Sequence, residues 1–391
     1  MPRQAQAFFA KASLVVAVAF FASPTNAPAQ TTAQKAELIP TAPARLRPLP
    51  MLTGGRMLAT SADSARAFAG PAWDQDWTSQ WPGSYFRAAF RGTAVFFRLG
   101  KGHEILHVVI DGQNSEPLVK PEPGVYAISG LNNSRHTIEV LVATESQDGP
   151  NTFGGFAIPP GEKALTAAPR HRQIEFIGDS HTVGYGNLSP KHACTTDQTW
   201  ATTDDTSAFG AITARHYGAD YQVNAISGRG VVRNYNGFAA DTLPQAWPYV
   251  LFDKRQEYND PAWKPQVLVI ALGTNDFSTP LNPGERWKTR DDLHADFEAT
   301  YARFLEMLRA RNPGALFIVW ATDMANGEIE AEARKVVEQR KHGGDARIEF
   351  LPIHGLSFGA CDWHPSLADD KAISDQLLPL IDADPRVWTG R

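Results

Sequence analysis

The chain has 391 residues, of which 43% are hydrophobic and 20% are charged. These proportions are typical of a folded globular protein, and the length is sufficient for two domains that each bury a core of ordinary size. The formal net charge of −5, together with a sequence that has no basic stripe, argues against binding to nucleic acid or to an anionic membrane surface, and we predict neither partner.

The first segment, residues 1–29, has the pattern of a secretory signal peptide. Arg3 and Lys11 make a basic start, an apolar run follows over residues 12–22, and small residues lead up to Ala29. The run is about half as long as a membrane-spanning helix requires, which disfavours a membrane anchor. We therefore predict cleavage near Ala29 and a mature protein that is secreted or periplasmic, with no membrane contact after cleavage.

A Pro- and Ala-rich lead over residues 30–51 is followed, over residues 52–160, by short β segments separated by turn residues. In residues 84–92 ("SYFRAAFRG") apolar side chains alternate with Arg87 and Arg91, which is the period of a half-buried strand. Closely spaced strands with little helical pattern indicate a β-sandwich of jelly-roll type. Such a domain either binds sugars or packs against its neighbour, and the pattern alone favours the second role. Further strands are predicted at residues 94–99, 105–111, 125–129 and 136–143.

Prolines interrupt this pattern, and we place an interdomain linker at residues 161–171. Over residues 172–391 apolar runs alternate with helical stretches, which predicts an α/β domain with a parallel sheet covered by helices on both faces. In such a sheet, functional sites gather at the carboxyl ends of the strands. The strands are predicted at residues 174–177, 221–226, 266–273, 315–321 and 348–353, and the clearest helices at 293–308, 328–341 and 368–381.

Glycine and polar residues stand at the ends of several predicted strands. They are Gly178 to Ser180, Ser227 to Gly230 and Gly273 to Asp276, and "CDWHPS", with Asp362 and His364, follows the last strand. Each fragment alone has an ordinary explanation, since a glycine after a strand is usually a turn and a single histidine is more often structural than catalytic. Their joint occurrence at successive strand ends favours catalysis.

Acyl transfer requires the residue types that these fragments supply. A serine hydroxyl becomes a useful nucleophile when an imidazole accepts its proton, so Ser180 and His364 are the candidate nucleophile and base. Asp362 is the candidate acid that orients the base. An oxyanion requires hydrogen-bond donors that are already in place, and the backbone N–H groups of Ser180 and Gly228 and the side-chain amide of Asn275 are candidates.

The same fragments resemble the conserved blocks of the SGNH hydrolases, the GDSL-type esterases and lipases. "GDSHTVGYG" resembles block one, "NAISGRG" block two, "LGTND" block three and "DWHP" block five. Together with "WPGSYFRAAFRGTAVFFRL" in the β-rich region, they resemble more narrowly carbohydrate esterase family two. Members of that family join a jelly-roll domain to an SGNH domain and remove acetyl groups from plant cell-wall polysaccharides such as xylan and glucomannan.

The resemblance implies Ser180 as nucleophile, His364 as base, Gly228 and Asn275 as oxyanion donors, and Asp362 as the third member of a triad. The usual SGNH pattern places the aspartate three residues before the histidine, whereas here the spacing is two. Family two has this shorter spacing, and some of its members orient the histidine through a backbone carbonyl instead. Both arrangements therefore remain open for this sequence.

Next to the nucleophile, His181 stands where block one usually carries leucine or isoleucine. A residue directly after the nucleophile on a tight strand-to-helix turn projects away from it, so we predict that His364 is the base. His181 is expected to pack beneath the turn with a hydrogen bond to its surroundings. Trp363, within the histidine motif, is the predicted substrate-binding residue, because aromatic faces suit the apolar faces of sugar rings.

The chain contains 2 cysteines, Cys194 and Cys361. In an oxidising compartment they can form a disulfide, which would tie the histidine loop to the nucleophile loop. Neither belongs to a C-x-x-C pair, and the sequence has no H-E-x-x-H motif or clustered metal ligands, so we predict no metal and no other cofactor.

These observations predict a secreted serine esterase, acting as a monomer, that removes O-acetyl groups from polysaccharide through an acetyl-enzyme on Ser180. Two alternatives remain open at this point. One is an SGNH lipase or thioesterase that acts on longer acyl esters, and the other is a non-catalytic carbohydrate-binding protein.

Overall fold

The computed structural model of the chain describes residues 34–61 and 73–389. The predicted signal peptide and the start of the lead lie outside the described residues. In the part of the chain that is described, no helix is both long and apolar enough to cross a membrane.

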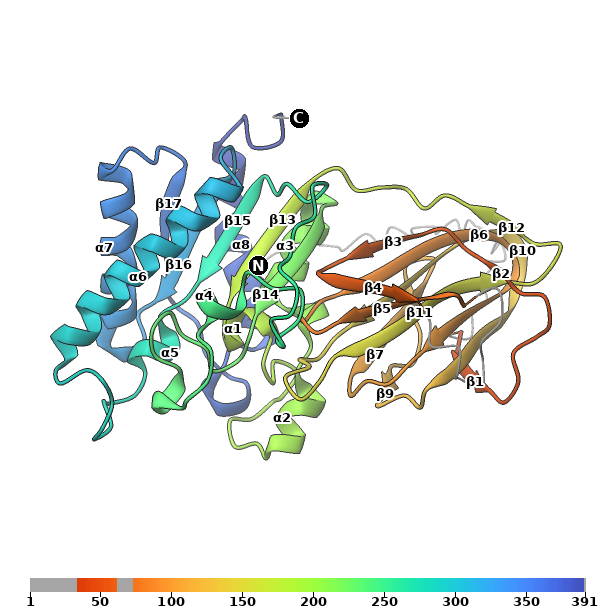
Figure 1. The fold of residues 1–391 in the computed structure, drawn as a ribbon, viewed down its shortest axis with the longest axis horizontal. Helices are drawn as coiled ribbons and strands as arrows, with labels where there is room; N and C mark the ends of the chain where they lie inside the picture. The colour runs from red at the N-terminus through yellow and green to blue at the C-terminus, as the bar shows by residue number, and fades with distance from the viewer. Residues whose placement is uncertain (1–33, 62–72, 390–391) are drawn as a thin grey trace, which may run out of the picture. The chain divides into compact units, whose positions relative to one another are not determined.

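An antiparallel sheet occupies the amino-terminal part of the chain (Figure 1). Its two longest strands pair with each other, and each covers two of the short strands that were predicted from the sequence. In the longer strand, a β-bulge between Ser129 and Ser134 accommodates the residues that separate the two predicted strands. The chain therefore continues as one strand. A buried aromatic cluster, which includes Phe86, Phe97 and Phe153, forms much of the core of this sheet. The jelly-roll connectivity stays a prediction. The strands are β3 (Met51–Gly54), β4 (Met57–Ser61), β5 (Gln75–Ser79), β6 (Tyr85–Leu99), β7 (Ile105–Ile110), β8 (Gln113–Asn114), β9 (Leu118–Val119), β10 (Gly124–Val142) and β11 (Asn151–Ile158).

Segments predicted as lead and linker also contribute strands to this sheet. In the lead, β1 (Glu37–Ile39) pairs with β10, and β2 (Arg47–Pro48) pairs with β11. In the predicted linker, β12 (Lys163–Leu165) pairs with β6. Short pairings of this kind depend on partners distant in the sequence, so the local pattern does not reveal them.

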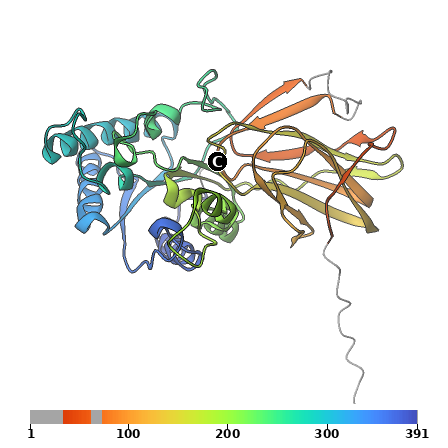
Figure 2. The same ribbon diagram turned by 90° about the horizontal axis from the view of Figure 1, so that it is seen from below.

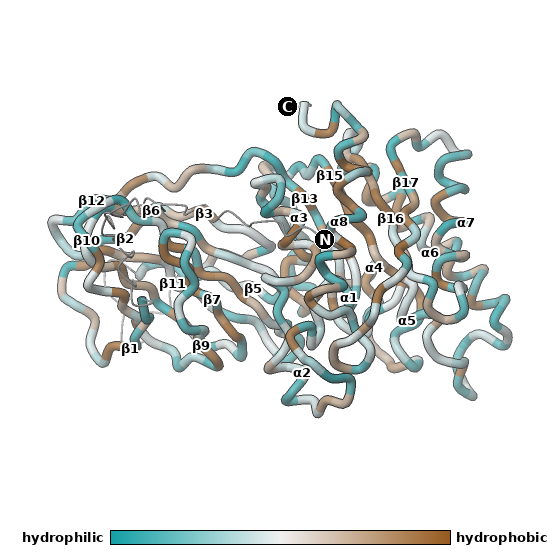
Figure 3. Tube along the Cα trace, turned by 180° about the vertical axis from the view of Figure 1, so that it is seen from behind, coloured by the Kyte–Doolittle hydropathy of each residue, from teal (hydrophilic) through white to brown (hydrophobic). Residues whose placement is uncertain are grey.

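The second sheet is parallel, with the strand order β14-β13-β15-β16-β17. Helices α6 and α7 cover one face, where Phe297 and Val336 pack with Ile270, and helices α3 and α8 cover the other. Figure 2 gives a second view of these layers, and Figure 3 shows hydrophobic residues along the strands. The strands are β13 (Gln173–Gly178), β14 (Asp220–Ala225), β15 (Val267–Ala271), β16 (Leu316–Thr322) and β17 (Ile348–Ile353). The helices are α1 (Ser180–Val183), α2 (Thr196–Thr202), α3 (Phe209–Tyr217), α4 (Leu243–Ala246), α5 (Thr274–Phe277), α6 (Arg290–Arg311), α7 (Glu328–His342) and α8 (Leu367–Ala383).

A buried arginine joins the two sheets. Arg56, in the turn between β3 and β4, forms an ion pair with Glu175 of β13, with 3.1 Å between Nη2 and Oε1, and donates to the carbonyl of Trp247. Its guanidinium also lies over the rings of Trp247 and Tyr258, at 4.6 Å from each centroid. Removing one partner of such a buried pair would leave an uncompensated charge in the interior, so the contact joins the two sheets through a pair whose disruption is strongly destabilising.

Candidate active site

The nucleophile turn follows strand β13, which lies between β14 and β15 in the parallel sheet. Asp179 caps helix α1, its Oδ1 accepting from the backbone N–H of His181 at 3.1 Å. A side chain at Gly178 would collide with Thr182, because a Cβ there would lie 2.0 Å from Oγ1. The sequence Gly-Asp-Ser thus allows a tight turn that presents Ser180 at the carboxyl edge of the sheet.

Ser180 and His364 are in direct contact across this edge. His364 Nε2 lies 2.9 Å from Ser180 Oγ, and His364 Nδ1 lies 2.9 Å from the carbonyl oxygen of Cys361. Because a carbonyl only accepts hydrogen bonds, Nδ1 carries the proton, and Nε2 is left free to accept the proton of the serine hydroxyl. Burial lowers the pKa of His364, while the Cys361 carbonyl and the charge of Asp362 oppose that shift.

Asp362 does not occupy the place predicted for the third member of a triad. Its side chain is exposed, and Oδ2 accepts from the hydroxyl of Tyr185 at 3.3 Å. The reason is local, since Asp362 and Trp363 both adopt left-handed backbone conformations, with φ of 51° and 57°. This reversal turns the carbonyl of Cys361 toward the imidazole of His364. The prediction that Asp362 orients the base is corrected accordingly.

The histidine loop is tied to the segment that follows the nucleophile block. Cys194 and Cys361 form a disulfide with a Cα–Cα distance of 5.5 Å. It passes close to Gly186, where a Cβ would lie 2.5 Å from the Cβ of Cys361. The backbone N–H of Asp362 also donates to the carbonyl of His192 at 2.8 Å. These links restrict the position of the Cys361 carbonyl, which is the group that holds the catalytic imidazole.

Trp363 projects from the same loop into solvent. Its side chain is 61% exposed, and its ring stacks on that of His192 with 4.9 Å between centroids. Tyr235 and Phe238, in the loop after β14, are exposed to 52% and 42%. Exposed aromatic faces of this size are available to a ligand, and sugar binding by Trp363 stays a prediction.

The loop after β14 holds the predicted oxyanion donor Gly228. Its φ of 80° and the ring of Phe238, 3.1 Å from where a Cβ would stand, both favour glycine. In the four residues 227–230, which the structure describes completely, the Gly228 N–H makes no hydrogen bond, whereas its neighbours on both sides are paired. The paired groups are Ser227 N and O, Gly228 O, Arg229 N and O, and Gly230 N and O. The unpaired N–H is therefore available to a ligand.

Asn275, at the start of helix α5, is held by groups from two neighbouring turns. Its Nδ2 lies 3.0 Å from Asp179 Oδ2 and 2.9 Å from the carbonyl oxygen of Arg229. Burial raises the pKa of the Asp179 carboxyl to about 7, an effect that the hydrogen bond from the His181 N–H opposes. Both amide hydrogens of Asn275 are thus engaged within the protein, so this side chain is a less available donor than Gly228.

His181 lies beside the dyad without contacting the serine hydroxyl. Its ring is 3% exposed and stands edge-on to that of His364, with 5.5 Å between centroids. Burial and the neighbouring His364 lower the pKa of His181 to about 3, so the ring is neutral at ordinary pH. In the described part of the chain no protein group forms a hydrogen bond with its ring, and the predicted hydrogen bond to its surroundings stays a prediction. The ring packs against Phe358 at 5.8 Å.

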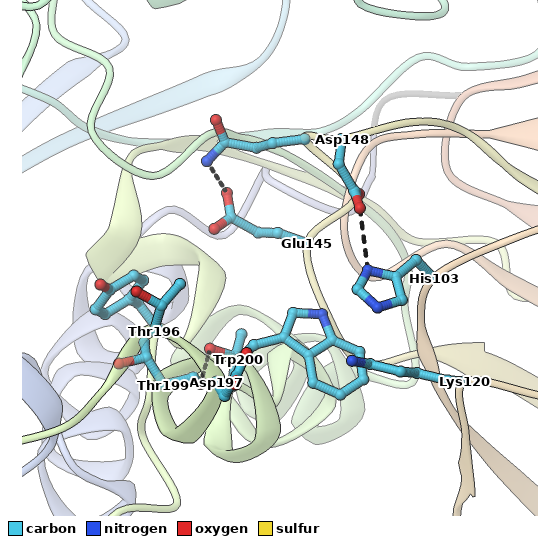
Figure 4. Close-up of a pocket in the computed structure, with 11 residues that line it drawn as sticks. His103, Lys120, Glu145, Asp148, Thr196, Asp197, Thr199 and Trp200 are labelled. Carbon is cyan, nitrogen blue, oxygen red and sulfur yellow. Dashed lines mark hydrogen bonds and ion pairs between the residues drawn. The ribbon is translucent and has the colours of Figure 1, made fainter.

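A pocket of about 330 Å³ reaches the dyad through Tyr185, and Figure 4 shows the side chains that line it. Tyr185 lines it, and the ring of Tyr185 lies 4.3 Å from that of His364. Trp200 of α2 stacks with His103 at 5.1 Å, and the ammonium of Lys120 lies 4.4 Å from its ring centroid. The segment after β10 contributes Glu145, Gln147 and Asp148, and α2 contributes a further carboxylate, Asp197. No sequence motif marks these residues, because they meet only when the two sheets pack together.

Comparison with known proteins agrees with this geometry. Residues 71–169 match the model for the amino-terminal region of carbohydrate esterase 2, and residues 176–377 match the GDSL-like lipase/acylhydrolase family. The chain is 41% identical, over 88% of its length and 93% of its relative's, to an acetylxylan esterase/glucomannan deacetylase of Cellvibrio japonicus. The chain belongs to carbohydrate esterase family two.

Solved structures of this esterase family show the same fold. One, described as a carbohydrate esterase whose active site displays divergent catalytic and non-catalytic binding functions, has a TM-score of 0.81 at 40% identity and covers 88% of this chain and 100% of its own. Another, a family two carbohydrate esterase from Clostridium thermocellum in complex with cellohexaose, has a TM-score of 0.72 at 26% identity and covers 85% and 98%. The SGNH-type sheet predicted from the sequence is confirmed, and so is the family.

Proposed function

We propose that this family member is a serine esterase that removes O-acetyl groups from polysaccharide of the xylan or glucomannan type through an acetyl-enzyme on Ser180. The observation that carries this proposal is the 2.9 Å contact between Ser180 Oγ and an imidazole nitrogen that must be unprotonated. The substrate class comes from the Cellvibrio japonicus relative, which is an acetylxylan esterase/glucomannan deacetylase.

The first half of the reaction forms the acetyl-enzyme. His364 Nε2 accepts the proton of Ser180 Oγ while that oxygen bonds to the acetyl carbonyl carbon. The resulting oxyanion accepts hydrogen bonds from the unpaired N–H of Gly228 and from the N–H of Ser180. It also accepts from a side-chain N–H of Asn275, which it shares with a protein acceptor. His364 then gives its proton to the sugar oxygen as the C–O bond breaks, which releases a free sugar hydroxyl.

The second half repeats these steps with water. Water attacks the acetyl-serine carbonyl while His364 accepts a proton from it. His364 then returns that proton to Ser180 Oγ as acetate leaves. The imidazole carries a positive charge twice in each cycle, and the Cys361 carbonyl stabilises this charge by accepting from Nδ1–H. We propose that the polysaccharide chain lies along the exposed Trp363 and the pocket beside Tyr185, where there is room for sugar rings.

We also propose that the enzyme is a monomer and that it is exported. Acetylated polysaccharide is extracellular and too large to enter a cell, and the signal-like pattern of residues 1–29 fits an enzyme that meets it outside the cytoplasm.

Acetate release across a panel of acetylated xylan, glucomannan, pectin and peptidoglycan tests activity and substrate together. We expect the largest rates on xylan or glucomannan, and no turnover by Ser180→Ala or His364→Ala proteins that retain the wild-type melting temperature. A series of aryl esters tests the lipase and thioesterase alternative, because a preference for long acyl chains would contradict deacetylation. A fluorophosphonate probe tests the non-catalytic alternative, since a protein without an activated serine would not be labelled at Ser180.

A further inference from the structure

The loop after β14, which carries Gly228, is held by two residues from the segment that follows β10 of the antiparallel sheet. We propose that Glu145 and Gln147, in the segment that follows β10, are positioning residues that fix the peptide group between Ser227 and Gly228, so that the Gly228 N–H is directed at the oxyanion. This inference rests on the proposed function, because it assigns a role to the groups around the proposed oxyanion donor.

The two side chains hold the Ser227 backbone from both sides. Glu145 Oε1 accepts from the N–H of Ser227 at 2.7 Å, and Gln147 Nε2 donates to the carbonyl of Ser227 at 3.3 Å. Gln147 Nε2 also lies 3.4 Å from Glu145 Oε1, which links the two side chains to each other. The antiparallel sheet therefore provides a donor and an acceptor to one residue of the catalytic loop.

The carbonyl of Ser227 and the N–H of Gly228 belong to the same peptide group. In a planar trans peptide these two groups point in opposite directions, so a bond that fixes the carbonyl also fixes the direction of the N–H. A donor on the carbonyl oxygen also polarises the peptide and makes its N–H a stronger donor. Gln147 thus acts on the oxyanion donor through the peptide, without contacting the substrate carbonyl.

Such support matters because glycine itself places little restriction on the peptide at this point. Gly228 has a φ of 80° and no side chain, and a glycine of this kind rotates its peptide easily. Pre-orientation matters for catalysis, since a donor that must rotate during the reaction stabilises the transition state less. An ionised carboxyl near an oxyanion would oppose it, and burial raises the pKa of Glu145, which reduces this opposition.

The test compares isosteric variants of the full-length mature enzyme. Glu145→Leu removes the acceptor for the Ser227 N–H, whereas Glu145→Gln keeps an acceptor oxygen at the same reach and removes only the charge. Gln147→Met keeps the length of the side chain and removes the donor. Gln113→Met, on the exposed strand β8, is the matched control for a glutamine-to-methionine change.

For each protein we would measure kcat, KM and the acidic limb of the pH profile with 4-nitrophenyl acetate. We would also measure the affinity for a trifluoromethyl ketone that forms a tetrahedral adduct with serine, and the melting temperature.

We expect kcat to fall about 10- to 100-fold in Glu145→Leu and about 3- to 10-fold in Gln147→Met. KM should stay unchanged because the oxyanion donor acts on the transition state, and the acidic limb should stay unchanged because His364 is untouched. The affinity for the ketone should fall in proportion to kcat/KM. Glu145→Gln should keep kcat within about 3-fold, because the acceptor remains. A merely structural role would instead lower the melting temperature and alter KM and the pH profile together.

The inference is overturned if both Glu145→Leu and Gln147→Met keep wild-type kcat, or if Glu145→Gln is as impaired as Glu145→Leu. If Glu145→Leu does not fold, the test rests on kcat of Gln147→Met. Because Gln147 is exposed, this variant is expected to fold and still to have a lower kcat. Failure of the proposed function is a separate result, in which the wild-type enzyme itself releases no acetate and is not labelled at Ser180.

Discussion

Replacing Asp362 by asparagine tests whether a backbone carbonyl, in place of a carboxylate, orients the catalytic base. In a serine triad that depends on its aspartate, the equivalent change lowers kcat about 10⁴-fold, because the imidazole loses its correct tautomer. Here the Cys361 carbonyl fixes the tautomer through His364 Nδ1 at 2.9 Å, and the Asp362 side chain is exposed and bonded to Tyr185 at 3.3 Å. We therefore expect Asp362→Asn to lower kcat less than about 10-fold, since an exposed charge contributes about 1 kcal/mol or less.

The direction of the pH effect follows from the same contacts. Asp362 raises the pKa of His364 by its negative charge. Because neutral His364 is the active form, activity rises as pH rises through this pKa. Removing the charge lowers the pKa, so the acidic limb of kcat/KM should move to lower pH in Asp362→Asn.

The measurement is the pH dependence of kcat/KM for 4-nitrophenyl acetate, with Asp375→Asn on the exposed surface of α8 as the matched control. A loss of 10³-fold or more in Asp362→Asn, or an acidic limb that moves to higher pH, would contradict orientation of His364 by the Cys361 carbonyl and identify Asp362 as the third member of the triad.

Three further changes have expected outcomes. In steady-state assays His181→Leu should keep kcat within about 3-fold, because the neutral, buried ring of His181 makes no hydrogen bond to the described protein residues. A loss comparable to that of His364→Ala would contradict this expectation. Asn275→Ala should lower kcat about 10²-fold, since it removes both the amide hydrogen that is shared with the oxyanion and a partner of the Asp179 carboxyl. Near-normal turnover would exclude Asn275 from the site. Cys361→Ser should lower the free energy of unfolding by about 2 to 5 kcal/mol, because the disulfide with Cys194 closes a loop of 167 residues; an unchanged denaturation midpoint would show that the bond contributes nothing.

The parallel sheet was predictable because its signals are local. Each of the five strands is an apolar run bounded by polar or glycine residues, and the rule that parallel strands gather their sites at one edge brings Ser180, Gly228 and Asn275 together. The helices were also predictable, since residues such as Phe297, Tyr301 and Leu308 recur on one face and are buried in the structure.

What the sequence did not reveal depends on backbone conformation and on contacts between distant segments. Two consecutive left-handed residues turn the Cys361 carbonyl toward His364, and nothing in "CDWHP" distinguishes this from a loop that presents Asp362. Glu145 and Gln147 are ordinary polar residues after a strand, and their contact with Ser227 exists only because the two sheets pack together. The short strands in the lead and linker were missed for the same reason.

Acetate release from acetylated xylan and glucomannan by the wild-type enzyme and by Ser180→Ala tests whether deacetylation proceeds through Ser180. We expect release by the wild-type enzyme, an acetyl group trapped on Ser180 after rapid acid quenching, and no release by a folded Ser180→Ala protein. Release that persists in Ser180→Ala, or an acetyl-enzyme formed on another residue, would contradict it.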